Sequence, residues 1–178
     1  MVCCCIYMTD KDLVADALSK KDHSVCDRVE DGKLRDECNY WVFQATANAS
    51  ICFKIGDQEK ADTCFMQTAV SAKQAWICDR VKESGGRDSC LMQVGRAIKE
   101  AYPCDSVSDN AQRDECFMEI ALLVNDSSVC WRLQGAPRDY CHRRVAETLR
   151  NSPTCENIQD ERAREGCQET ITRSLLGI

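Results

Sequence analysis

The sequence is poor in glycine, proline and aromatic residues. It has eight glycines and three prolines among 178 residues, and phenylalanine, tyrosine and tryptophan make up 6% of the chain. A β-sandwich of this size has many tight turns and many aromatic strand residues. The scarcity of both argues against a turn-rich β fold and favours an all-α fold.

Long apolar runs and a surplus of basic residues are missing too. No run approaches the ~20 apolar residues that a membrane-spanning helix needs, so we expect no transmembrane segment. The formal net charge of −6 gives no general attraction for nucleic acid or anionic lipid. Residues 1–8 lack a basic start and are too short for the apolar core of a secretory signal. If the protein is exported, its signal has been removed or lies outside this sequence.

Cysteine is the residue in excess, with fifteen copies. After the cluster Cys3, Cys4 and Cys5, twelve cysteines follow at alternating spacings of 12 and 14 residues, with a single spacing of 11. They are Cys26, Cys38, Cys52, Cys64, Cys78, Cys90, Cys104, Cys116, Cys130, Cys141, Cys155 and Cys167. This regularity defines six copies of a 26-residue unit, of which the fifth is one residue shorter.

Other residue types keep the same phase. A branched apolar residue stands three positions after the first cysteine of every unit, from Val29 to Ile158. An acid stands two positions before the second cysteine, from Asp36 to Glu165, and an arginine precedes it in five of the six units. Mostly apolar or small residues stand four, five and eight positions after the second cysteine. These spacings draw an apolar stripe along one face of a helix.

Each unit is therefore predicted to be a helical hairpin. A shorter helix carries the first cysteine, and Ser152 with Pro153 is a start signal for that helix in the sixth unit. Turn-forming residues such as 135–137 (Gly-Ala-Pro) separate it from a longer helix that carries the second cysteine. The acid before the second cysteine suits the first turn of the longer helix, where negative charge meets the helix dipole.

The hairpins are expected to stack as a short solenoid. Residues 11–16 align on 115–120, with Asp12 in the place of Cys116, so a half-repeat precedes the six units. The predicted fold is all-α, with six tandem 26-residue helical hairpins and an N-terminal half-repeat stapled by disulfides. The predicted organisation is a Cys-rich tail over 1–8 and one α-solenoid domain over 9–178.

Two disulfide pairings respect the period. Pairing across the long gaps would leave Cys26 and Cys167 unpaired, whereas pairing across the short gaps leaves none of the twelve cysteines over. Cysteines near a tight connection also face each other across an antiparallel hairpin. The predicted bonds are Cys26–Cys38, Cys52–Cys64, Cys78–Cys90, Cys104–Cys116, Cys130–Cys141 and Cys155–Cys167.

This repeat of disulfide-linked helical hairpins resembles disulfide-linked Sel1-like repeats and the paired-cysteine helical hairpins of mitochondrial intermembrane-space proteins. Its unit is shorter than Sel1-like and tetratricopeptide units, and their signature residues are missing. The mitochondrial hairpins carry two cysteines on each helix, where this chain has one. No functional residue is carried over from either family.

Two other uses of cysteine compete with structural disulfides. A thiol-based store of Cu(I) or Zn in a reducing compartment is the alternative function, although the repeats lack the close cysteine pairs and the i, i+3, i+4 spacings that such sites use. We therefore expect no metal ligand and no cofactor. Cys3, Cys4 and Cys5 lie outside the repeat and fit a tail, with an intermolecular crosslink or S-acylation as the functional alternatives.

No pattern predicts catalysis. His23 and His142 occupy unrelated repeat positions, and the chain has no Gly-rich phosphate loop. The arginine–acid pairs fit a helix start with an ion pair between units better than a ligand-binding ladder. Trp41, Trp76 and Trp131 would anchor a partner if exposed and are packing residues otherwise.

The sequence therefore predicts a non-catalytic structural or interaction protein. Its disulfides place it outside the cell or at the cell surface, with the cytosol of a hyperthermophile as the alternative. We expect a protein partner or self-association, and head-to-tail stacking of solenoid ends would give a filament.

Overall fold

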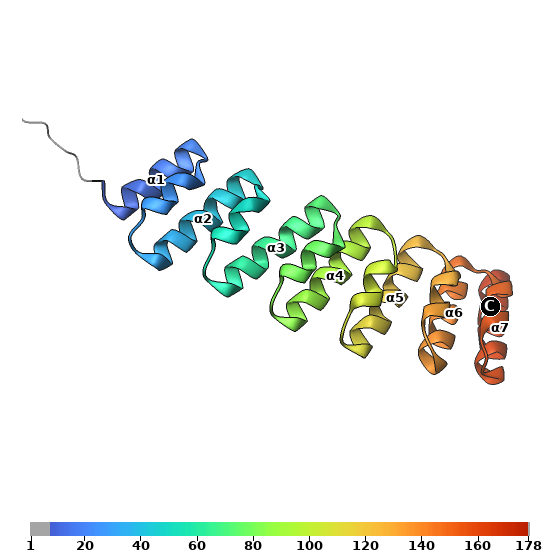
Figure 1. The fold of residues 1–178 in the computed structure, drawn as a ribbon. Coiled ribbons are helices and arrows are strands. Elements are labelled where there is room, and N and C mark those ends of the chain that lie inside the picture. Colours follow the sequence, from blue (N-terminus) through green and yellow to red (C-terminus); the bar gives the residue numbers. More distant parts are fainter. Residues whose placement is uncertain (1–7, 178) are drawn as a thin grey trace, which may run out of the picture. The chain divides into compact units, whose positions relative to one another are not determined.

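The computed structural model describes residues 8–177, and within this range the chain forms helices and no strand (Figure 1). Seven α-helices alternate with six short 3-10 helices, which confirms the predicted all-α hairpin repeat. The α-helices are α1 Asp10–Lys20, α2 Gly32–Thr46, α3 Gln58–Ala72, α4 Ser84–Ile98, α5 Asn110–Val124, α6 Gly135–Leu149 and α7 Glu161–Leu176. The 3-10 helices are η1 His23–Arg28, η2 Ala49–Lys54, η3 Ala75–Arg80, η4 Tyr102–Ser106, η5 Ser127–Arg132 and η6 Ser152–Asn157.

The described residues form two compact units, 8–87 and 88–177. The single domain predicted over 9–178 stays a prediction. Cys3, Cys4 and Cys5 lie outside the described residues, and so does any crosslink or lipid that they carry. None of the described helices is long and apolar enough to span a bilayer.

The first cysteine of each repeat lies on a 3-10 helix of five or six residues. Short polar side chains open three of these helices. Asp22, Asn48 and Asp126 each accept a hydrogen bond from the backbone N–H two residues ahead, at 2.8–3.1 Å. In the sixth repeat Asn151 precedes the helix, so the predicted cap at Ser152 is wrong by one residue. The side-chain hydrogen bonds of Asp22, Asn48 and Asp126 favour a tight local turn over a longer α-helix.

The second cysteine lies in the middle of a longer α-helix. Aspartates seven positions before it cap α2, α3, α5 and α7, because their carboxylates accept the N–H group of the third helical residue at 2.8–3.0 Å. The helix therefore begins six residues before the cysteine. Asp36 and its equivalents stand in the second helical turn, and the prediction that they belong to the first turn is wrong.

The long helices end on residues with positive φ. Lys21, Ala47, Lys73, Asn125 and Arg150 all have φ between 49° and 57°, in the left-handed region. A residue in this conformation at the end of a helix lets its N–H group reach back to the last free carbonyls. Glycine is the usual residue there, and because none of these five positions holds glycine, the sequence does not mark the five helix ends.

The core consists of the repeated apolar positions together with the cysteines. The residue three positions after the first cysteine and the residue four positions after the second are buried in every repeat. The residue eight positions after the second cysteine is not, since the helices end at or next to it. Leu149 is 40% exposed and Leu175 is 63% exposed, so the predicted apolar stripe is wrong at its last position.

A disulfide closes each hairpin between its 3-10 helix and its α-helix. The bonds are Cys26–Cys38, Cys52–Cys64, Cys104–Cys116, Cys130–Cys141 and Cys155–Cys167. Cys78 and Cys90 are disulfide-bonded as well. The Cα–Cα distances of 5.5–5.9 Å are those at which disulfides are most often found. All twelve cysteines are buried, so they serve as core and as crosslink at once.

Candidate binding face

An aspartate side chain in one repeat forms hydrogen bonds with the backbone of the next repeat. Asp36 accepts hydrogen bonds from the backbone N–H groups of Gly56 and Asp57, at 2.9 and 2.7 Å. The acids at the same repeat position bind N–H groups 20 and 21 residues further along in the same way. These acids, which we call clamp aspartates, are Asp10, Asp36, Asp62, Asp88 and Asp139. Each one fixes the start of the next long helix.

The clamp hydrogen bonds favour the charged carboxylate. The N–H groups of Asp31 and Glu30 hold the pKa of Asp10 below its ordinary value. Burial raises the pKa of Asp139, but the N–H groups of Gln159 and Asp160 outweigh that effect, and its pKa is lowered. The carboxylates of Asp10 and Asp139 are therefore favoured in their ionised form.

The arginine before the clamp aspartate donates a hydrogen bond within its own hairpin. Arg35 donates from Nη1 to the carbonyl oxygen of Val29 at 3.3 Å, which satisfies a carbonyl at the end of η1. Arg164 binds Ile158 in the same way, also at 3.3 Å. The predicted ion pair between units is therefore wrong at this position, since the acid binds backbone N–H groups instead.

Two ion pairs between repeats join neighbouring 3-10 helices. Lys54 on η2 pairs with Asp27 on η1 at 3.3 Å, and Arg132 on η5 pairs with Asp105 on η4. At the equivalent place Arg80 on η3 stacks over Phe53 on η2, with the guanidinium carbon 5.6 Å from the ring centroid. Phe53 thus stands in a position that carries an acid in other repeats.

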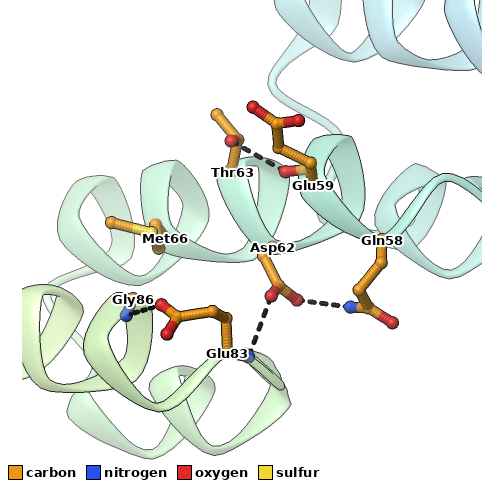
Figure 2. Close-up of a pocket in the computed structure, with 7 residues that line it drawn as sticks. All are labelled: Gln58, Glu59, Asp62, Thr63, Met66, Glu83 and Gly86. Atoms are coloured by element: carbon orange, nitrogen blue, oxygen red, sulfur yellow. Dashed lines mark hydrogen bonds between the residues drawn. The ribbon is translucent and has the colours of Figure 1, made fainter.

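Grooves lie between three pairs of consecutive α-helices, on the other side of each helix. In the first unit a groove of 380 Å³ is lined by Gln58, Glu59, Asp62, Thr63, Met66, Glu83 and Gly86. Figure 2 shows Asp62 pointing from α3 toward Glu83, at the start of α4. The Asp62 carboxylate accepts the N–H groups of Lys82 and Glu83 and the Gln58 amide, and Glu83 accepts the N–H groups of Gly85 and Gly86.

Because the Asp62 and Glu83 carboxylates already accept backbone N–H groups, a ligand would meet other groups in the groove. The Thr63 hydroxyl donates to the carbonyl oxygen of Glu59 at 2.9 Å. The Glu59 carboxylate and the half-buried Met66 thioether then remain as the groups open to a partner. The groove therefore pairs one apolar side chain with one carboxylate that makes no hydrogen bond to the backbone.

The same groove recurs with different chemistry. In the second unit, Ala136, Asp139, Tyr140, Arg143, Asp160 and Ala163 line a groove of 290 Å³ between α6 and α7. Counted from the second cysteine, these residues occupy the positions of the first groove, with Tyr140 in the place of Thr63 and Arg143 in that of Met66. A third groove of 240 Å³ lies between α2 and α3 and is lined by Tyr40, Glu59, Lys60 and Thr63. The fold thus builds the groove, and each repeat supplies its own lining.

We call the surface beside these grooves the groove face. The name covers the positions one before, two after and three after the second cysteine, on α2 and α3 in the first unit and on α4, α5 and α6 in the second, and it is used of each unit by itself. In chain order these are Glu37, Tyr40 and Trp41; Thr63, Met66 and Gln67; Ser89, Met92 and Gln93; Glu115, Met118 and Glu119; and Tyr140, Arg143 and Arg144. The middle position is aromatic or methionine in four repeats, of which Met92 is buried, and methionine is the most adaptable of the apolar side chains. These positions recur regularly in the sequence, but they did not predict a binding surface because the residues are neither invariant nor fully apolar.

The three tryptophans are exposed, although most tryptophans pack in the interior. Trp41 on α2 belongs to the groove face, whereas Trp76 and Trp131 lie on 3-10 helices; their exposed fractions are 41%, 63% and 53%.

His142 occupies a buried position on α6. His142 is fully buried, packs edge-on against Trp131 at 4.8 Å between ring centroids, and has no hydrogen-bond partner at either ring nitrogen. Burial, together with the nearby Arg138, lowers the pKa of His142. The imidazole is therefore held in its neutral form in an apolar site.

No group of three or more His, Cys, Asp or Glu side chains in residues 8–177 is placed to hold a metal ion. A thiol-based Cu(I) or Zn store needs thiolates, and the repeat cysteines are all disulfides here. Comparisons of the chain with protein-family models, with curated proteins and with solved structures find no match. The groove face is thus the feature from which a function can be inferred.

Proposed function

We propose that this protein is a non-catalytic scaffold that binds a protein partner through its groove face. The observation that supports this function is the recurrence of one groove at the same repeat positions with changing side chains. Met66 and Glu59 line it in the first unit, and Tyr140 and Arg143 line it in the second. Stacked helical repeats commonly use such a surface to bind an extended or helical segment.

Two features make the scaffold durable. Each hairpin has its own disulfide, which contributes up to ~3 kcal/mol for a loop of about this length. Clamp aspartates such as Asp36 then tie each long helix to the repeat before it. We place the protein outside the cell or at the cell surface, because disulfides of this number persist in oxidising surroundings.

Selection from a random peptide library displayed on phage tests this function. The oxidised full chain is the bait, and hydrogen exchange maps where the selected peptides bind. We expect protection on the groove face of the long helices. Met66→Glu should weaken peptides that bind the first unit by at least roughly tenfold, because it places a second charge beside Glu59.

Phe53→Asp is the matched control. It removes an exposed aromatic residue from the opposite side and restores the acid that pairs with a base in neighbouring repeats. Its peptide affinity should stay within about twofold of the parent. Peptides that lose affinity in Phe53→Asp but not in Met66→Glu would place binding on the 3-10 helices and contradict the proposal.

Self-association is a second candidate function, supported by exposed leucines in the second unit. Leu123, Leu149 and Leu175 lie near the C-terminal ends of α5, α6 and α7 and are exposed. Exposed apolar side chains at the same end of neighbouring helices are typical of a contact surface. Head-to-tail assembly through this edge would give filaments visible by electron microscopy at high concentration. Discrete monomers in the parent, with an unchanged sedimentation profile in Leu149→Glu, would argue against it.

A further inference from the structure

Two guanidinium groups flank one exposed tyrosine ring on α6. The guanidinium carbons of Arg143 and Arg144 lie 5.2 and 5.9 Å from the centroid of the Tyr140 ring. Arg144 also donates from Nη1 to the Tyr140 hydroxyl at 3.3 Å. The ring therefore holds two adjacent arginines side by side on the groove face, with the remaining N–H groups available to a ligand.

Arg144 lacks the partner that its repeat position has elsewhere. In two other repeats the residue three positions after the second cysteine contacts the residue six positions after the second cysteine of the preceding repeat. This contact is an ion pair of 2.6 Å between Glu119 and Arg96, and a hydrogen bond of 2.7 Å between Gln67 and Gln44. Before Arg144 that position holds Leu122, which has no polar group to offer. The charge of Arg144 is thus left for a partner outside the chain.

Arg143 is also poorly matched within the chain. Its one ion pair among the described residues, with Glu147, is long at 3.9 Å, and its Nε is buried without a hydrogen-bond partner. The two carboxylates that line the neighbouring groove do not supply that partner. Asp139 accepts the N–H groups of Gln159 and Asp160, and Asp160 accepts the N–H group of Ala163.

The local charge differs from that of the whole chain. Residues 131–150 contain five arginines and two acids, whereas the chain has a net charge of −6. On the neighbouring helix α5, the groove face carries Glu115 and Glu119 instead. A long polyanion laid along this face would meet those carboxylates and be repelled. The charges fit a ligand whose negative charge is confined to one place.

We infer that Tyr140, Arg143 and Arg144 form the docking site for an acidic side chain of a protein segment bound in the groove face. A carboxylate accepts paired hydrogen bonds from guanidinium groups, and the Tyr140 ring fixes the direction from which it does so. This inference rests on the proposed function, because it names the chemistry of the partner at one part of the same face.

The library selection described above tests the inference when it is repeated with two double variants. The full oxidised chain is the bait, and bound peptides that protect α5 and α6 from hydrogen exchange are sequenced and synthesised. We expect them to be enriched in aspartate or glutamate. R143Q/R144Q should lower their affinity at least about tenfold, whereas R162Q/R173Q, which removes the same charge from α7, should change it less than about twofold.

The outcomes separate the two proposals. Peptides that bind α5 and α6 without acidic enrichment, or that bind R143Q/R144Q as well as the parent, overturn the acidic site and leave the scaffold function standing. Failure of every peptide to protect the groove face overturns both. Tighter binding of a heparin fragment than of the acidic peptides would assign the arginines to a polyanion and also overturn the inference. Equal losses of peptide affinity in both double variants would mean that only the net charge matters, and this would also overturn the acidic docking site.

Discussion

The carboxylate of Asp36 accepts the backbone N–H group of Asp57 at 2.7 Å, and Asp57 in turn caps α3 by accepting the N–H group of Lys60 at 3.0 Å. The Asp36 side chain thus fixes the backbone of Asp57, the residue that caps α3. Because the two residues belong to neighbouring repeats, the hydrogen bond couples one repeat to the next. Repeat proteins depend on such nearest-neighbour terms for their cooperativity.

Asp36→Asn tests the clamp. An amide keeps the size of the side chain but retains one acceptor oxygen, so one N–H group of the next repeat loses its partner. We expect a loss of ~1–3 kcal/mol in the free energy of unfolding. Asp114→Asn is the matched control, since Asp114 has the same repeat position but makes no clamp among the described residues. Urea denaturation of both variants by circular dichroism measures the difference, and equal losses would count against the clamp.

The phase of the cysteines made the repeat predictable. Twelve cysteines at fixed spacings imply one structural unit, and the choice of which cysteines pair follows because one pairing leaves Cys26 and Cys167 over. The buried positions of the core were also predictable, since Val29 and Val42 recur with their equivalents in every repeat. These features depend on regular spacing, which a sequence displays directly.

The contacts between repeats were not predictable. The partners of Asp36 are backbone N–H groups, which carry no residue identity and leave no sequence pattern. The helix end at Ala47 lacks the glycine that usually marks a left-handed residue. The grooves arise from how neighbouring helices pack, and lining residues such as Thr63 and Met66 look like ordinary surface positions until that packing is known.

Ala47→Gly is expected to stabilise the protein. Ala47 ends α2 with a φ of 54°, a conformation that costs a residue with a side chain roughly 1 kcal/mol more than it costs glycine. A gain of ~0.5–1 kcal/mol should therefore appear as a higher thermal midpoint. Ala45→Gly, two residues earlier and inside the helix, should lose ~0.5–1 kcal/mol. Two variants that shift the midpoint in the same direction would contradict the role of the left-handed cap.

Removal of one disulfide should destabilise the chain. Cys26→Ala with Cys38→Ala opens the first hairpin, whose 3-10 helix of six residues has few bonds of its own. We expect a loss of ~2–5 kcal/mol, measured by urea denaturation. Alkylation of the unreduced, denatured parent should label none of the twelve repeat cysteines. Labelling of Cys26 and Cys38 in that experiment would mean that the bond is absent in solution.

Buried His142 should make the protein sensitive to mild acid. Both ring nitrogens lack a hydrogen-bond partner, and burial together with Arg138 lowers the pKa of His142 from its ordinary value of 6.5. The folded state therefore binds this proton less readily than the unfolded state does. The contribution of the neutral imidazole is fully present above pH 6.5 and is lost as the pH falls from 6.5 toward the lowered pKa.

His142→Phe should remove that sensitivity. The equivalent residues Phe65 and Phe117 show that a phenyl ring fits this repeat position. The thermal midpoint of the variant should rise at neutral pH, because two unpaired nitrogens are replaced by apolar atoms at a site where each costs ~1–3 kcal/mol. Its midpoint should also change less than that of the parent between about pH 7.5 and about pH 5. Phe117→His is the reciprocal control and should acquire the acid sensitivity; a parent-like pH profile in both variants would show that neither site titrates with folding.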